Sequence, residues 1–322
     1  MRIKLRRARK LVNETAVAPI GTRADRRKVI PQYMVPKRRL TAFAGRVASA
    51  EGGRTAKTTI RWFVGKYGVD MSEAVESDFT KYTSFNAFFT RALKPGARPL
   101  ADCALVSPVD GSISQFGPID HDQILQAKGH RYSTTALVGG DARLAKHFHD
   151  GYFATLYLSP RDYHRIHMPC DGRLLRMIHV PGDLFSVNPT TARGVPGLFA
   201  RNERVVCVFE RLRDAGAGAT PAAPGVDPEL FVVVLVGATI VGSMATVWHG
   251  VINAPRQRRL REWHYGAGQA EDIVLRQGDE LGRFLLGSTV VMLFPKGPLK
   301  FNPAWEPGRA IRFGESMAVE SP

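Results

Sequence analysis

Residues 230–248, with the sequence LFVVVLVGATIVGSMATVW, carry no charged side chain over 19 consecutive positions. A stretch of this length is long enough for a helix that crosses a membrane. Val, Ile and Thr dominate it, however, and Gly237 and Gly242 interrupt it. These residue types favour strands and turns over a continuous helix. We therefore predict two buried strands joined by a turn.

From about residue 100 onward the sequence has a similar strand-like pattern. Short apolar runs alternate with turns rich in Gly, Pro, Asp and Asn, which is typical of strands. The runs occupy residues 152–158, 173–180, 204–209, 230–248 and 289–294. We predict a β-rich domain over residues 99–322, built as a mainly antiparallel sandwich or barrel. Residues 211–227 are rich in Gly, Ala and Pro and predict a surface loop.

Before residue 99 the apolar residues recur with helical spacing, at i, i+3, i+4 and i+7 in the first two stripes and at i, i+3, i+4 and i+8 in the third. The three stripes are Leu40, Phe43, Ala44 and Val47; Ile60, Phe63, Val64 and Tyr67; and Phe85, Phe88, Phe89 and Leu93. Lys and Arg flank the first two stripes, which we expect to lie on an anionic bilayer. We expect the third, with Ser84 as its N-cap, to pack on the core. Residues 31–98 are thus expected to be helical and membrane-associating, and the fold class is expected to be α+β.

Basic residues gather at the start of the chain. The formal net charge is +16, and residues 1–40 hold 13 Lys and Arg against two acidic residues. Such a segment suggests attraction to anionic lipid or to nucleic acid, and its composition also suits a solvated tail. We expect residues 1–30 to form a disordered basic extension.

The tetrapeptide Leu286-Gly287-Ser288-Thr289 precedes an apolar strand. Val290 stands where a G-x-S-x-G nucleophile elbow needs glycine, so this hydrolase pattern fails. Because Gly287 has no side chain, Ser288 Oγ can approach its carbonyl and displace the peptide nitrogen, giving an ester. Loss of the Ser288 Cα proton then expels the carboxylate and leaves dehydroalanine, which tautomerises and hydrolyses to a pyruvoyl group. A Gly-Ser pair alone is far more often a turn into a strand.

Two histidines lie three residues apart in YLSPRDYHRIHMP, residues 157–169. Side chains at this spacing share one face of a helix or tight turn, so His164 and His167 could serve one site. Imidazole is a natural acid or base near neutral pH, and metal binding is the competing use. Asp110 precedes Gly111 in SPVDG, which is usually a turn, but an Asp can also orient a His that activates a Ser.

The motifs occur in one order along the chain. They are LGST at 286–289, YLSPRDYHRIHMPCDG at 157–172, SPVDG at 107–111, PGDLFSVNP at 181–189, LFARNERVV at 198–206, VGATIVGSMATVW at 236–248, PKRRLTAFAG at 36–45, KYGVDMSEA at 66–74 and FNAFFTRALKPGARP at 85–99. Together they resemble the bacterial phosphatidylserine decarboxylases, and the resemblance covers about residues 31–315.

The resemblance implies a role for each matching residue. Asp110, His167 and Ser288 would form a self-processing triad, in which His167 takes the Ser288 proton and Asp110 holds the imidazole. Cleavage between Gly287 and Ser288 would give chains 1–287 and 288–322, which remain associated, the second beginning with a pyruvoyl group. His164 would act in decarboxylation, by reprotonating the carbanion.

The implied substrate is phosphatidylserine, which would form a Schiff base with the pyruvoyl group and leave as phosphatidylethanolamine and CO2. This chemistry requires neither a metal nor pyridoxal phosphate. The resemblance also implies a homodimer, bound peripherally to the anionic cytoplasmic face of the cell membrane, with no nucleic-acid partner.

Two other classes of protein stay open at this point. A serine hydrolase using Asp110, His167 and Ser288 would keep its chain intact and react with a fluorophosphonate. A non-enzymatic basic protein that binds nucleic acid or membrane would tolerate the loss of the Ser288 hydroxyl.

Overall fold

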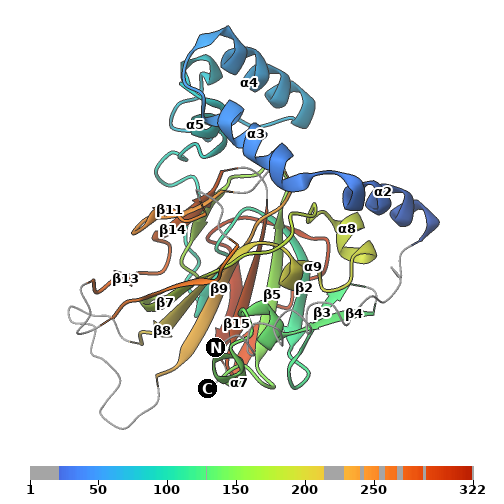
Figure 1. Cartoon of the computed structure of the whole chain (residues 1–322). Helices are drawn as coiled ribbons and strands as arrows, with labels where there is room; N and C mark the ends of the chain where they lie inside the picture. The colour runs from blue at the N-terminus through green and yellow to red at the C-terminus, as the bar shows by residue number, and fades with distance from the viewer. Residues whose placement is uncertain are drawn as a thin grey trace.

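The computed structural model describes residues 22–127, 129–213, 228–239, 243–253, 258–266, 271–285 and 288–320. It is an α+β protein, as expected. Helices α2 (Arg23–Met34), α3 (Lys37–Ser49), α4 (Gly53–Tyr67) and α5 (Phe85–Phe89) lie beside a body of antiparallel strands (Figure 1).

A nine-stranded antiparallel sheet forms the centre of the body. Its order is β12 (Arg261–His264), β7 (Gly172–Val180), β8 (Arg204–Arg211), β9 (Leu230–Val236), β15 (Ser288–Phe294), β5 (Tyr152–Leu158), β2 (Gly111–Pro118) and β17 (Ala310–Ile311), with β13 (Val274–Leu275) also pairing with β7. In the described part of the chain the two ends of this order do not pair, so the barrel alternative is not formed.

Both faces of this sheet are buried, which explains the uncharged runs. In β9, Phe231, Val233 and Leu235 enter one hydrophobic cluster. Val232 and Val234 enter the cluster on the opposite face, because side chains alternate along a strand. The predicted pair of buried strands at 230–248 is confirmed as β9 and β10 (Met244–Thr246). No helix within the described ranges is long and apolar enough to cross a membrane.

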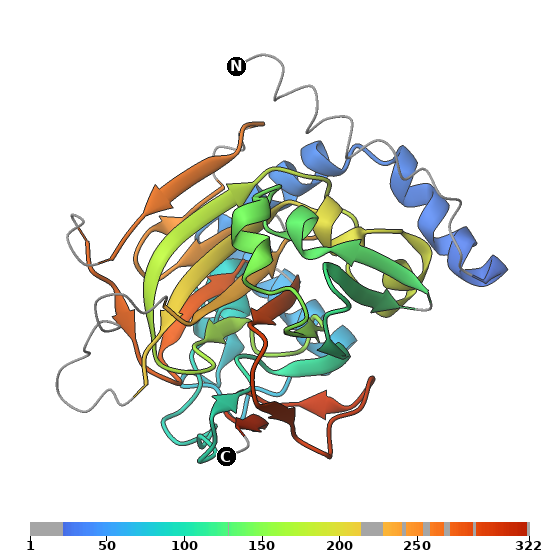
Figure 2. The same cartoon turned by 90° about the horizontal axis from the view of Figure 1, so that it is seen from below.

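The two faces are covered differently (Figures 1 and 2). The first is covered by a four-stranded sheet, β11 (Gly250–Val251), β10, β14 (Glu280–Phe284) and β6 (Arg165–His167), and a three-stranded sheet, β1 (Leu105–Val106), β18 (Ser316–Glu320) and β16 (Leu299–Phe301). The second is covered by short helices α6 (Thr134–Leu137), α7 (Ala142–Lys146), α8 (Pro189–Gly194) and α9 (Leu198–Arg201) and the hairpin of β3 (Gln123–Ala127) and β4 (His130–Ser133). The body is therefore layered, as a sandwich is.

The three predicted apolar stripes have different surroundings. Ser84 caps α5 by accepting a hydrogen bond from Ala87 N at 3.1 Å, and the phenylalanines of α5 are buried as predicted. They pack against Ile60 and Phe63 of α4, so the prediction that this second stripe faces a bilayer is wrong. The first stripe, on α3, lies at the surface, with Phe43 65% exposed.

Helix α2 begins within the segment that was expected to be disordered. Thr22 and Asp25 form a capping box at its N-terminus, and Asp25 pairs with Arg193 at 3.0 Å. Val29 is fully buried against Gly194 of α8, where a Cβ would lie 2.8 Å from the Val29 side chain. Residues 22–30 are thus part of the fold. Residues 1–21, and residues 214–227 of the predicted loop, lie outside the described residues.

Candidate active site

Three distant stretches of the sequence meet at one end of the nine-stranded sheet. Strand β15 begins at Ser288, which pairs with Leu158 at the end of β5. Tyr157 of β5 pairs with Thr289 on one side and with Ser112 of β2 on the other. Strand β5 therefore lies between β15 and the start of β2, which directly follows Asp110. Neighbouring strands of a sheet lie about 4.8 Å apart, so β15 and β2, on either side of β5, are about 10 Å apart.

Gly111 permits the close approach of β2 to β5 at this end of the sheet. A Cβ at this position would lie 2.3 Å from the carbonyl oxygen of Tyr157. Gly111 opens a strand and is not among the residues with positive φ. The glycine after Asp110 thus serves strand packing and not a left-handed turn.

Beyond β5 the chain returns through β6, which pairs with β14, the strand that leads toward Ser288. His167 pairs with Glu280 at the far end of β14, whereas the carbonyl of His164 accepts a hydrogen bond from Phe284 N at 3.0 Å. His164 is thus level with the end of β14 nearer to Ser288. Leu286 and Gly287 lie outside the described residues.

The two histidines do not share a helical face, because the chain is extended here and residues three apart project to opposite sides of a strand. The His164 ring lies 4.0 Å from the ring of Phe89 in α5. The His167 ring stacks on Phe313 at 3.7 Å. The expectation that their spacing alone brings them together is therefore not met, and each ring has its own surroundings.

His164 is fully buried. Its Nδ1 lies 2.7 Å from the carbonyl oxygen of Asp162, so Nδ1–H donates and Nε2 is left as an acceptor. Nε2 is buried and has no hydrogen-bond partner among the described residues. Burial, aided by the positive charge of Arg91, lowers the pKa of His164 to about 3 although the bond to Asp162 opposes this. The lowered pKa favours the neutral ring at neutral pH, in which Nε2 can accept a hydrogen bond.

His167 is held at both ring nitrogens. Its Nδ1–H donates to the carbonyl oxygen of Gly278 at 2.8 Å, and the hydroxyl of Tyr163 donates to Nε2 at 3.0 Å. Burial lowers the pKa of His167, which favours the neutral ring. His167 is therefore a second candidate base, with its acceptor nitrogen turned toward Tyr163.

Asp110 does not bond directly to His167, as a simple triad would require. Its carboxylate accepts two hydrogen bonds from Arg98, at 3.0 and 2.7 Å, and one from the backbone N–H of Phe313 at 2.8 Å. The position that Asp110 was expected to take at the imidazole is occupied by the Gly278 carbonyl. Asp110 is linked to His167 through Phe313, whose backbone N–H donates to its carboxylate and whose ring stacks on the imidazole.

Ser288 has a fully buried hydroxyl that makes no hydrogen bond to any described residue. Buried hydroxyls are usually paired, so an unpaired one indicates a functional role or a partner outside the described residues. Alternation along β15 places Ser288 on the same face as Val290 and Met292. That face is covered by the sheet that contains β6, in which His167 is the last residue and which His164 directly precedes.

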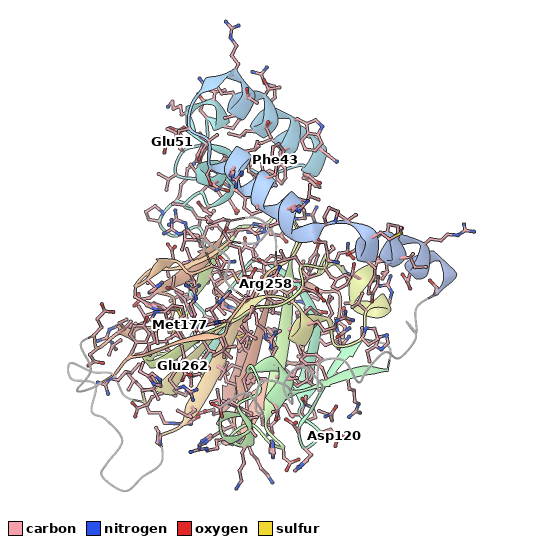
Figure 3. The ribbon with its side chains drawn as sticks, viewed as in Figure 1. Phe43, Glu51, Asp120, Met177, Arg258 and Glu262 are labelled. Atoms are coloured by element: carbon pink, nitrogen blue, oxygen red, sulfur yellow. The ribbon has the colours of Figure 1, made fainter. Side chains whose placement is uncertain are left out.

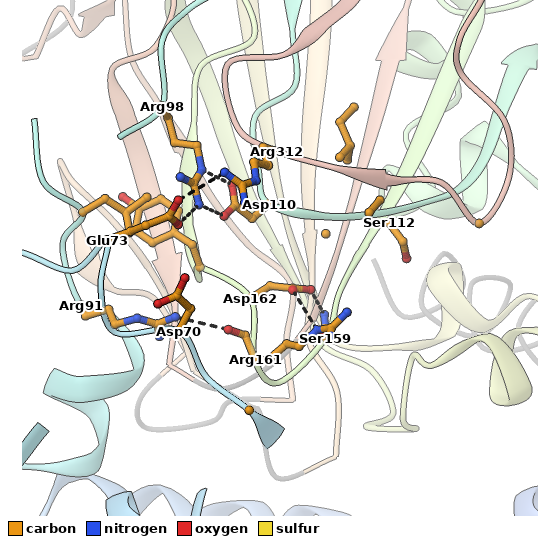
Figure 4. A pocket seen from close by; sticks show the side chains of 17 residues that line it. Asp70, Glu73, Arg91, Arg98, Asp110, Ser112, Ser159, Arg161, Asp162 and Arg312 are labelled. Atoms are coloured by element: carbon orange, nitrogen blue, oxygen red, sulfur yellow. Dashed lines mark hydrogen bonds and ion pairs between the residues drawn. The ribbon is translucent and has the colours of Figure 1, made fainter. Parts of the chain in front are cut away.

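A cavity of about 450 Å³ lies beside this sheet end, between the helical region and the body (Figure 4). Its lining includes Asp110, Ser159 and Tyr163, together with Arg91 and Arg98. Tyr163, Arg91 and Arg98 are not predicted as site residues from the sequence. All three fall within motifs that carry the family resemblance, but no spacing rule distinguishes them from surface residues.

Comparison with known proteins agrees with these motifs. A family model described as Phosphatidylserine decarboxylase matches residues 85–319, which include all four candidate residues. The chain belongs to the phosphatidylserine decarboxylase family. A second family model, described as PSD, matches residues 27–68. Phosphatidylserine decarboxylases are carboxy-lyases, so the chain is an enzyme of that class.

Relatives in the phosphatidylserine decarboxylase family match over nearly their whole length. The phosphatidylserine decarboxylase proenzyme of Polaromonas naphthalenivorans is 69% identical over 295 residues, which span 92% of this chain and 97% of the relative. The proenzyme of Variovorax paradoxus is also 69% identical, over 92% of this chain and 98% of its own. The proenzyme of Azoarcus sp. is 65% identical, over 91% of this chain and 96% of the relative's length.

Proposed function

We propose that this chain is a self-cleaving enzyme that decarboxylates phosphatidylserine to phosphatidylethanolamine. The observation that carries the proposal is the Ser288 hydroxyl, which is buried, unpaired among the described residues and faces the layer that supplies two neutral histidines. The family membership and the name of the relatives, which are proenzymes of this activity, support the same conclusion.

Cleavage would begin when Ser288 Oγ attacks the carbonyl carbon of Gly287 and its proton passes to a neutral imidazole. The bond to the Ser288 nitrogen breaks, the nitrogen takes a proton, and an ester remains. Removal of the Ser288 Cα proton then breaks the Cβ–Oγ bond, and Gly287 leaves as a carboxylate. The resulting dehydroalanine tautomerises to an imine, and one water converts it to a pyruvoyl group and ammonia. The family resemblance assigns the role of base to His167, whose Nε2 is an acceptor that the Tyr163 hydroxyl binds.

The two products of cleavage would stay together. Strand β15 begins at the new terminus and pairs with β5 on one side and β9 on the other. All seven of its residues are buried. Cleavage just before β15 breaks one covalent bond but removes none of these strand pairings.

The pyruvoyl group would supply a carbonyl that forms a Schiff base with the substrate amine and an electron sink for decarboxylation. The role proposed for His164 is to hold a proton at Nε2 beside the reacting carbon. Burial opposes protonation of this ring, so the proton is retained only while negative charge develops close to it. Phe89, packed against the ring, helps to exclude water.

The intact mass of the purified protein tests this function. We expect two species, corresponding to residues 1–287 and 288–322, with the smaller chain refractory to N-terminal sequencing because a pyruvoyl group has no amine. The cleaved protein should release CO2 from phosphatidylserine. A single active species of 35.5 kDa that reacts with a fluorophosphonate would favour a serine hydrolase instead.

We also propose that α2 and α3 bind the enzyme peripherally to an anionic bilayer, the expected site of its lipid substrate. Apolar side chains that are normally buried are exposed along these helices: Ile30, Tyr33, Met34, Leu40, Phe43 and Val47. Arg39 and Arg46 are exposed on α3 with them. Figure 3 shows Phe43 in the helical part of the molecule, away from the central sheet. Exposed apolar groups beside cations suit the boundary between head groups and acyl chains.

Replacing Phe43 and Val47 together by Glu should weaken binding to anionic vesicles about tenfold or more, because apolar burial is lost and negative charge is added. Co-sedimentation with phosphatidylglycerol-containing vesicles measures this. The matched control is Val274→Glu, which changes a 40% exposed valine in the body and should bind like the wild type. Equal binding of the double variant would remove α3 from the membrane interface.

A further inference from the structure

Arg91 is a buried cation that makes a single side-chain hydrogen bond to the described residues. Arg91 is 5% exposed, and its Nη2 donates one hydrogen bond to the carbonyl oxygen of Arg161 at 3.3 Å. Its Nε is buried without a partner among the described residues. Burial lowers the pKa of Arg91, because water no longer solvates its charge. A guanidinium carries five N–H donors, and buried donors are nearly always satisfied in folded proteins.

The other arginines that line the cavity already have acidic partners (Figure 4). Arg98 pairs with both Asp110 and Glu73 at 2.7 Å. Arg312 pairs with Glu73 at 3.2 Å, and Arg161 lies 3.9 Å from Asp162. Within the described ranges, no carboxylate lies within ion-pair distance of Arg91. Of the four arginines, it is therefore the one whose charge the described protein leaves without a direct counter-ion.

The acidic side chains around the cavity are occupied elsewhere. The carboxylate of Asp110 is bound by Arg98, that of Asp162 accepts from Ser159 N at 2.6 Å, and that of Asp70 accepts from Ser72 N at 2.8 Å. None of the three turns to Arg91 as an ion-pair partner. An anionic ligand would therefore meet an unpaired guanidinium.

The cavity connects the two parts of the proposed enzyme. Gly68, at the end of α4, and Arg91 contribute from the helical region, and Ser159 contributes from the end of β5. Ser159 directly follows Leu158, the partner of Ser288. The charge of Arg91 also reaches His164, whose pKa it helps to lower. A ligand held by Arg91 would thus lie between the end of the helical region and the candidate catalytic residues.

We propose that Arg91 is the binding residue for the phosphodiester of the lipid head group. This inference rests on the proposed function, since it concerns the substrate of that site. The substrate carboxylate must lose its charge as CO2, so an ion pair with it would oppose the reaction. The amine must reach residue 288. The phosphodiester is the charged group that does not react, and its two free oxygens match the fork of a guanidinium.

Ligand binding by the uncleaved chain tests the proposal independently of catalysis. Full-length protein with Ser288→Ala is titrated calorimetrically with dihexanoylphosphatidylserine and with dihexanoylphosphatidylethanolamine, both below their micellar concentrations. Adding Arg91→Gln should weaken the binding of both lipids roughly 10- to 100-fold, as expected for losing hydrogen bonds to a charged group. Arg91→Lys keeps the charge without the fork and should show a smaller loss. Arg131→Gln, a partly exposed arginine on β4, is the matched control and should bind like its parent.

The two lipids distinguish the possible partners of Arg91, because only phosphatidylserine has a carboxylate. If Arg91→Gln weakens the binding of phosphatidylserine alone, Arg91 binds the carboxylate and the proposal is overturned. Unchanged binding of both lipids also overturns it. If Arg91→Gln does not fold, as judged by thermal melting, Arg91→Lys decides, and unaltered affinity in that variant overturns the proposal. Failure of wild-type self-cleavage would affect the proposed function and leave this binding test unchanged.

Discussion

Ser288→Ala is expected to leave the chain as one uncleaved and inactive species of about 35.5 kDa. The reason is chemical: without the hydroxyl no nucleophile can displace the peptide nitrogen, and no precursor of the pyruvoyl group exists. The fold should survive, because Ser288 makes no described hydrogen bond and alanine fits the same buried space. Intact mass spectrometry and release of CO2 from phosphatidylserine measure the two losses, each expected to be complete.

Thr289→Val is the matched control for this variant. Thr289 is the next residue of β15, it is also fully buried, and its hydroxyl also lacks a described partner. Alternation places it on the opposite face of the sheet. Thr289→Val should therefore be cleaved and active, although it too loses a buried hydroxyl. Cleavage of the Ser288→Ala protein between residues 287 and 288 would contradict the proposed mechanism.

His164→Ala is expected to be cleaved like the wild type but to lose decarboxylase activity by roughly 10²- to 10⁴-fold, the range typical of a general acid or base. Because His164 is fully buried, His164→Gln is made in parallel, since it retains more side-chain volume without the imidazole chemistry. The cleaved fraction by mass and the rate of CO2 release report the two steps separately.

His167→Ala provides the contrast, since its chain should remain uncleaved. His264→Ala, in which the lost side chain is 62% exposed on β12, serves as the control and should be cleaved and active. If His164→Ala were the uncleaved variant and His167→Ala the cleaved one, the two histidines would have exchanged the proposed roles. The unpaired Nε2 of His164 makes this a meaningful comparison.

The periodicity of apolar residues predicts that a helix has an apolar face, but not what covers that face. The same spacing predicts an apolar face on α3 and on α4, and both helices form. On α4 this face packs against the phenylalanines of α5, whereas on α3 it remains exposed. Flanking Lys and Arg residues do not distinguish the two cases, because long basic side chains reach solvent beside a buried face as easily as beside an exposed one.

For the candidate site residues, the motifs identify the residues but not their partners. The motif around His164 and His167 identifies both residues, but its helical interpretation is wrong because β6 is extended. The partner of Asp110 could not be found locally either. Arg98 and Phe313 bind its carboxylate, and Phe313 lies 203 residues away along the chain.

The sequence by itself determined the properties that depend on neighbouring residues. The uncharged, β-rich run at residues 230–236 predicts a strand buried on both faces, as β9 is. The Gly-Ser pair predicts a peptide carbonyl that no side chain of residue 287 shields. Only the tertiary structure decided which distant residues meet: Ser288 with Leu158, Asp110 with Arg98, and Arg91 with no described carboxylate. Hydrophobicity and peptide-bond chemistry are local, whereas strand register and the pairing of buried charges arise only when distant segments come into contact.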